Sequence, residues 1–393
     1  MSRLLGLFLL FILPAQACLW DRDTLQEEAK GKLDTVRAIT GWFDRYPSRY
    51  YEMRLERVTA ELSSNPRSLN LYDDAGVACS RLGRHDEAIA WMAKKKVALD
   101  ALPDGGPADD RYRYLSNLGT FHLIRWMTAG ESQRSENIGD LEVSETLIAQ
   151  ALDLNPDAHF GREQYQLMLI QWLLRGADVS SGDPFRESFL NLDISLMSHG
   201  SPSTSKDPTL EDARQGITGL IQMGAAWESI DVFRALQICL HGQQASSVAH
   251  LAYMRQQELA ESGASSLHPD EEVRQAVRPY TFPGTFYGGK QVERFYRDAR
   301  TAAAKRDQAW TAYQDDRFAQ GMHPDTHPGF WKDWQGPEMP KMPNLTLGHF
   351  TNRYPGSSFA IIVGALVSGP IAIYLFARRV RRARRRRFVS AAA

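Results

Sequence analysis

Residues Leu69–Pro103, LNLYDDAGVACSRLGRHDEAIAWMAKKKVALDALP, decide the fold of this chain. In their first half, apolar residues recur three and four apart along one helix face, and Leu82-Gly83 ends that helix. A second face with the same spacing begins directly after this turn. Small residues at Gly76 and Ala88 allow the two helices to approach closely. The stretch therefore predicts an antiparallel helix pair.

A similar pattern returns on both sides of this stretch. Leu118-Gly119 restarts the first helix of a second unit, and Ser144 to Pro156 (SETLIAQALDLNP) supplies its second helix after an insertion at Thr128 to Gly139. Strands of alternating pattern are scarce. Weaker helices of the same kind are expected at Glu56 to Pro66, Phe160 to Gly176 and Asp212 to Leu240. The predicted fold class is all-α, built from antiparallel helix pairs.

The quoted stretch resembles a tetratricopeptide repeat. The family's aromatic residue, small-Gly pair, Leu-Gly and D-E-A-I fall in order on Tyr72, Ala75-Gly76, Leu82-Gly83 and Asp86-Glu87-Ala88-Ile89. The closing Ala-Leu-x-x-x-Pro comes about three residues late for the family period of about 34 residues, with its proline at Pro103. We therefore expect an extended second helix. The resemblance implies an α-solenoid, in which each unit buries its face by stacking on a neighbour.

The same resemblance implies binding rather than catalysis. In that family the first helix of each pair lines the inner face of a superhelix, where partner peptides or helices lie. The matching positions, which form the candidate partner-binding site, are Asn70, Asp73, Val77, Ser80, Arg113, Ser116, Asn117 and Thr120. The alternative is that their polar members only face water.

The two ends of the chain predict a membrane-anchored protein. Residues 1–17 have the charge, apolar run and small-x-small ending of a secretory signal peptide, with a second anchor or a lipoprotein signal acylating Cys18 as alternatives. Residues 357–377 hold an apolar run of about 19 residues, enough to span a bilayer as a helix. The arginine-rich tail at 378–393 predicts a cytoplasmic C-terminus and a periplasmic or extracellular N-terminal domain. This layout also suits a sorting tag that a membrane protease removes.

The net charge of the chain excludes one class of partner. The formal net charge is −1, and setting aside the eight arginines of the tail leaves −9 for the rest of the chain. An acidic exterior argues against nucleic acid as a partner.

Three cysteines do not make a disulfide scaffold. We expect Cys79 and Cys239 to be buried free thiols, with a bridge between them as the alternative.

Two segments lie between the signal peptide and the predicted span. Residues 18–260 form the predicted repeat domain, and residues 261–356 a helical and Pro/His/aromatic-rich juxtamembrane region. Gln291 to Asp315 reads as a charged helix. The aromatic residues that follow it are expected to pack on the folded domain rather than at lipid headgroups, and these are Phe330, Trp331 and Trp334.

The chain shows little catalytic chemistry. There is no Gly-rich phosphate loop, nucleophile elbow or thiol-hydrolase signature, and no cofactor is implied. The best metal candidate is HPDTHP, where His323, Asp325 and His327 would act with His349, but both of its histidines precede proline and share no helix face. We expect a membrane-anchored interaction scaffold on the exoplasmic side, not an enzyme; a metal-binding protein or metal-dependent enzyme using this segment is the alternative.

Overall fold

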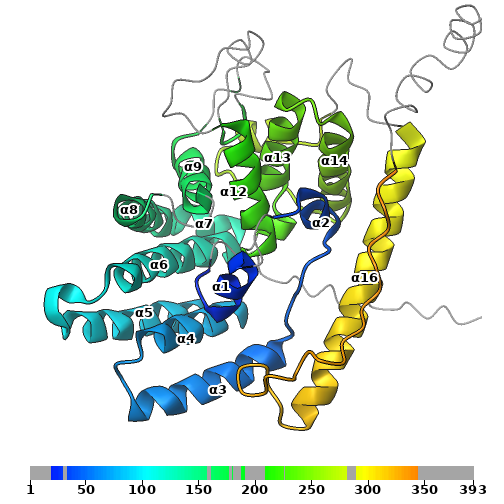
Figure 1. Cartoon of the computed structure of the whole chain (residues 1–393). Helices are drawn as coiled ribbons and strands as arrows, with labels where there is room; N and C mark the ends of the chain where they lie inside the picture. Colours follow the sequence, from blue (N-terminus) through cyan, green and yellow to red (C-terminus); the bar gives the residue numbers. More distant parts are fainter. Residues whose placement is uncertain are drawn as a thin grey trace, which may run out of the picture.

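The computed structural model describes residues 19–29, 33–156, 161–176, 179, 187–190, 209–224, 226–280 and 289–343. Within these ranges the protein has fourteen α-helices and no strand, which confirms the all-α prediction (Figure 1). The predicted signal peptide, the apolar run at 357–377, the arginine-rich tail and His349 lie outside the described residues.

The first half of the fold is a series of antiparallel helices in chain order (Figure 1). The pair predicted from the quoted stretch packs as expected, and so does the pair on either side of the insertion. The helices of this half are α3 (Ser48–Ser64), α4 (Leu69–Arg81), α5 (His85–Asp100), α6 (Ala108–Thr128), α8 (Ile138–Leu154) and α9 (Arg162–Arg175). The short helix α7 (Glu131–Glu136) occupies the predicted insertion.

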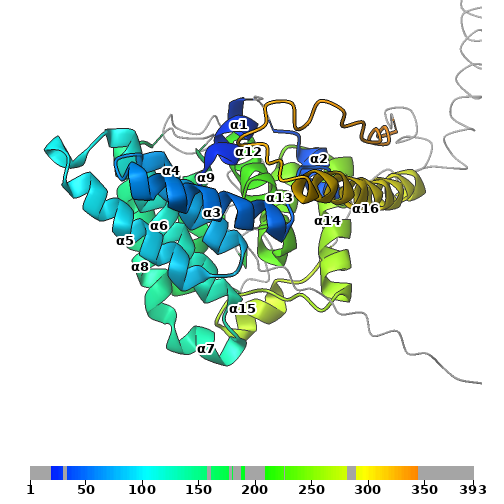
Figure 2. The ribbon, with the colours of Figure 1, turned by 90° about the horizontal axis from the view of Figure 1, so that it is seen from below.

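The second half continues the stack. Helix α12 (Leu210–Gln222) packs on α9 and α13 (Ile230–Gly242), and α14 (Ser246–Glu261) packs on α13. Of two short helices from the N-terminal part, α2 (Thr35–Thr40) packs on α12 and α14, and α1 (Arg22–Ala29) lies near α12 (Figures 1 and 2). Helix α15 (Glu271–Ala276) lies near α7 (Figure 2).

Glycines set the closest helix approaches. A Cβ added at Gly76 in α4 would lie 2.9 Å from Met92 Cε in α5, and one at Gly119 in α6 would lie 3.0 Å from Ile148 in α8. Both glycines therefore permit close helix packing, which the sequence predicted for Gly76. Gly83 ends the first helix of the pair with a positive φ of 74°, a conformation that glycine adopts without strain.

The long helix α16 (Gly289–Ala319) lies beside α2 and contacts α14 and α3 (Figure 2). After it, the chain turns back and runs along the same helix (Figure 1). Trp331 stacks on Trp310 of α16 with ring centroids 4.3 Å apart, and Phe330 is buried against Tyr50 and Tyr51 of α3. The predicted packing of these aromatic residues on the folded domain is thus confirmed.

Both described cysteines are buried free thiols, as expected. Burial raises the pKa of Cys79 to about 11 and that of Cys239 to about 12, so neither is a reactive thiolate at neutral pH. Over the part of the chain that the structure describes, no helix combines the length and apolar character that a membrane crossing needs.

Candidate functional site

The structure places most of the predicted inner-face residues in the interior. Asn70 is exposed and Arg113 is partly buried. The remaining predicted positions are buried, namely Asp73, Val77, Ser80, Ser116, Asn117 and Thr120. They come from α4 and α6, which lie side by side.

The chain's own N-terminal segment covers this face. We call residues Leu19–Thr24 the N-terminal plug. The Trp20 N–H donates to Asn117 Oδ1 at 2.8 Å, and Asn117 Nδ2 donates to the Trp20 carbonyl at 3.0 Å. One carboxamide thus satisfies both backbone groups of Trp20, as a neighbouring strand would. The predicted face is therefore covered by a segment of the same chain.

The Trp20 side chain is the anchor of the plug and is only 1% exposed. Its indole N–H lies 3.0 Å from both Ser116 Oγ in α6 and Glu163 Oε1 in α9. The Arg162 guanidinium lies 4.8 Å from the ring centroid, within cation–π range. Side chains from two helices of the stack therefore surround one aromatic ring.

Charged groups hold the C-terminal half of the plug. Arg22 donates to Asp74 of α4 at 2.5 and 2.8 Å. The fully buried Arg54 of α3 donates to Asp21 at 3.2 Å and to Asp23 at 2.7 Å. A buried charge of this kind is tolerated only when it is paired, so the plug and α3 depend on each other.

Further polar groups lie beneath the plug. Lys95 of α5 donates to Asp73 at 2.5 Å, and Asn117 also donates to Asp73 at 3.0 Å. Burial raises the pKa of Asp73 to about 6, against the opposing charge of Lys95. In α9, Gln166 donates to Thr120 of α6 at 2.9 Å. These hydrogen bonds join α4, α5, α6 and α9 beneath the plug.

Sequence reasoning missed the contribution of α9 and of the plug. Arg162, Glu163 and Gln166 are buried on α9, and the expected helix at Phe160 to Gly176 is the signal that could have located them. Leu19 and Trp20 follow Cys18, just after the predicted signal peptide, and carry no repeat pattern, so the repeat resemblance does not point to them.

In the candidate metal site, the Asp325 carboxylate is paired with arginine side chains. Asp325 accepts from Arg54 at 2.7 and 2.9 Å and from Arg57 at 2.6 Å, and Arg22 lies 3.5 Å away. Burial opposes ionisation, but the hydrogen bonds and charge of Arg54 lower the pKa of Asp325 well below its usual range. His323 Nε2 lies 3.1 Å from the Tyr50 carbonyl. Among the described residues no group of three His, Cys, Asp or Glu side chains could hold a metal ion.

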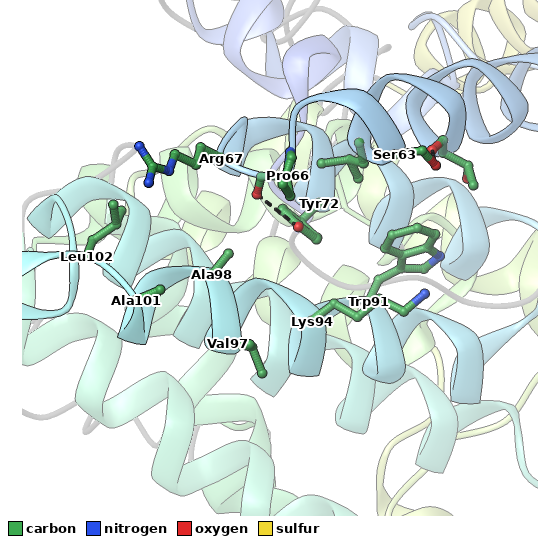
Figure 3. Close-up of a pocket in the computed structure, with 12 residues that line it drawn as sticks. Ser63, Pro66, Arg67, Tyr72, Trp91, Lys94, Val97, Ala98, Ala101 and Leu102 are labelled. Carbon is green, nitrogen blue, oxygen red and sulfur yellow. Dashed lines mark hydrogen bonds between the residues drawn. The ribbon is translucent and has the colours of Figure 1, made fainter.

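An open groove lies on a different face, between α3 and α5 (Figure 3). We call it the α3–α5 groove. It encloses about 610 Å³ and is walled by the C-terminal half of α3, the turn into α4 and the outer face of α5. Its apolar and aromatic lining residues are Leu62, Pro66, Tyr72, Trp91, Val97, Ala98, Ala101 and Leu102.

The floor of the groove is fixed while its rim is exposed. The Tyr72 hydroxyl donates to the Pro66 carbonyl at 3.0 Å, and the Tyr72 and Trp91 rings lie 6.2 Å apart. Val97 is 72% exposed, the most of any large hydrophobic residue in the described ranges. Lys94 Nζ lies 3.8 Å from the centroid of the Trp91 ring. Aromatic and apolar side chains held in this way are typical of protein-binding surfaces.

No protein-family model matches the chain, and neither a curated protein nor a solved structure matches it. Its function is therefore inferred from its own residues.

Proposed function

We propose that this protein is a membrane-anchored scaffold of tetratricopeptide-like helix pairs that binds a protein partner outside the cytoplasm. The apolar run at 357–377 and the arginine tail support the anchor and its orientation. The first-helix and turn motifs in Leu69–Pro103 and the consecutive antiparallel packing support the repeat assignment. The protein acts by binding and not by catalysis.

The observation that carries the proposal is the α3–α5 groove with its exposed Val97. The inner face is already filled, and displacing a fully buried tryptophan from it would cost about 2–3 kcal/mol of apolar transfer alone. A partner that binds the groove faces no such cost. The partner site proposed here therefore lies on the outer side of α5, while the inner-face residues serve mainly to hold the plug.

Affinity capture from membrane extracts tests this function. The full-length protein, Val97→Glu and Lys96→Glu are used as baits, and the captured proteins are compared by mass spectrometry. Lys96 is the matched control because it is exposed on the same helix, pairs with Asp100 and does not line the groove. We expect a partner that Lys96→Glu retains and Val97→Glu loses. Capture that is equal with all three baits would contradict a role for the groove.

A further inference from the structure

We propose that the α3–α5 groove binds an acidic amphipathic α-helix of the partner protein. This inference rests on the proposed function and names the class of partner segment. Three features of the groove carry it: its length and small residues, its walls and its charge.

The groove has the dimensions of a short helix. It follows α5 from Trp91 to the C-cap residue Ala101, which is about 15 Å at 1.5 Å per residue, or about three helical turns. Ala98 and Ala101 lie along its course, and small side chains permit close approach of a second helix. Val97 is exposed beside them. A helix laid here would bury two or three apolar side chains spaced three and four residues apart.

The walls of the groove favour a helix over an extended peptide. Both long walls are helices, α3 and α5, whose interior N–H and C=O groups bond within their own helix. An extended peptide would find no strand edge to pair with and would leave its backbone groups unpaired on an apolar floor. A helix satisfies its own backbone groups and offers only side chains.

The charge of the groove selects an acidic partner. Arg67 lies near one end and Lys94 near the other (Figure 3). None of the twelve lining residues is a carboxylate, although the chain without its arginine tail is acidic. Glu52 and Glu56 line a separate depression beyond Thr59. Anionic side chains on the exposed flanks of a bound helix would therefore meet cations at both ends of the groove.

The test is peptide binding to the full-length protein in detergent micelles, measured by fluorescence polarisation. The probe is a labelled, capped peptide of about 14 residues, with Leu or Phe at i, i+4, i+7 and i+11 and Ala or Glu elsewhere. Two companion peptides serve as controls. In the Lys peptide every Glu is replaced by Lys, and in the Pro peptide a central residue is replaced by Pro. We expect the Glu peptide to bind at least about tenfold tighter than either companion.

Variants assign the binding to the groove. Val97→Asp should weaken binding of the Glu peptide at least about tenfold, since a carboxylate replaces an apolar contact. Arg67→Glu with Lys94→Glu should weaken it about fivefold or more and favour the Lys peptide, whereas Lys96→Glu should stay within about twofold. Circular dichroism checks that each variant is folded.

Several results would overturn the inference. If the Lys peptide binds as tightly as the Glu peptide, the groove does not select an acidic helix. If the Pro peptide binds as tightly, the groove does not require a helix. If the Glu peptide does not bind, both parts of the inference are wrong. Binding of phosphatidylglycerol vesicles that Val97→Asp abolishes, with no peptide bound, would assign the groove to lipid instead. If affinity capture of a protein partner still depends on Val97 in any of these cases, the proposed function is retained and only the proposed class of partner segment is wrong.

Discussion

Replacing Trp20 with alanine should destabilise the whole fold, because the plug joins α3, α4, α6 and α9. The indole is 1% exposed and lies 3.0 Å from both Ser116 and Glu163. Truncating a buried aromatic residue costs about 3–5 kcal/mol, and leaving buried polar partners unpaired adds about 1 kcal/mol or more. We expect a loss of about 4–6 kcal/mol in the free energy of unfolding. Urea titration of the full-length protein in detergent, followed by far-ultraviolet circular dichroism, measures it.

Trp91→Ala is the matched control, since the same side chain is removed from a partly exposed position in α5. It should cost about 1–2 kcal/mol. A Trp20→Ala variant within about 1 kcal/mol of the parent would refute the reasoning, because the plug would then not be part of the stable fold.

Two further changes test the ion pairs that Arg54 makes with Asp21, Asp23 and Asp325, and the His323 ring beside them. Arg54→Met leaves Asp21, Asp23 and Asp325 without their shared cation and should cost about 3–5 kcal/mol by urea titration at neutral pH, against about 1 kcal/mol for the more exposed Arg57→Met; equal losses would contradict the central role of Arg54. Burial lowers the pKa of His323 to about 4, below its ordinary value of 6.5. The fold thus favours the neutral ring, and this stabilisation is present above pH 6.5 and lost as the pH falls toward 4. The free energy of unfolding of the parent minus that of His323→Asn should therefore fall by about 2 kcal/mol between about pH 7 and pH 4, and a constant difference would contradict it.

The sequence predicted the helix pairs because their packing depends on local spacing. Gly76 and Gly119 mark close helix approaches that a repeat pattern makes visible. The second helix of the quoted stretch is long, as the late Pro103 predicted, since α5 runs to Asp100. The helix faces and helix ends that predict these features are set by residues within one or two turns of each other, which is the range that periodicity reports.

The plug could not be predicted in this way. The Trp20 to Asn117 contact joins residues 97 positions apart, and the plug itself carries no helical repeat. The helical spacing of α4 and α6 predicts which of their residues share one face. It does not say whether a partner or the chain's own segment covers that face. Their burial, seen at Asp73 and Asn117, answers that question.

The groove left a signal in the sequence that the repeat pattern obscured. Helix α5 buries Ala88, Met92 and Leu99 on one face, while Trp91 and Val97 lie on another. A helix with apolar residues on two faces has more apolar surface than one neighbouring helix can cover.

Photo-crosslinking in living cells tests the central claim most directly. A benzophenone amino acid is placed at Val97 in the groove and, in a separate strain, at Asn70, the exposed position on the predicted inner-face register of α4. We predict that a partner protein is crosslinked from Val97 and not from Asn70. Crosslinking from Asn70 alone would contradict the groove as the partner site and return the partner to the inner face.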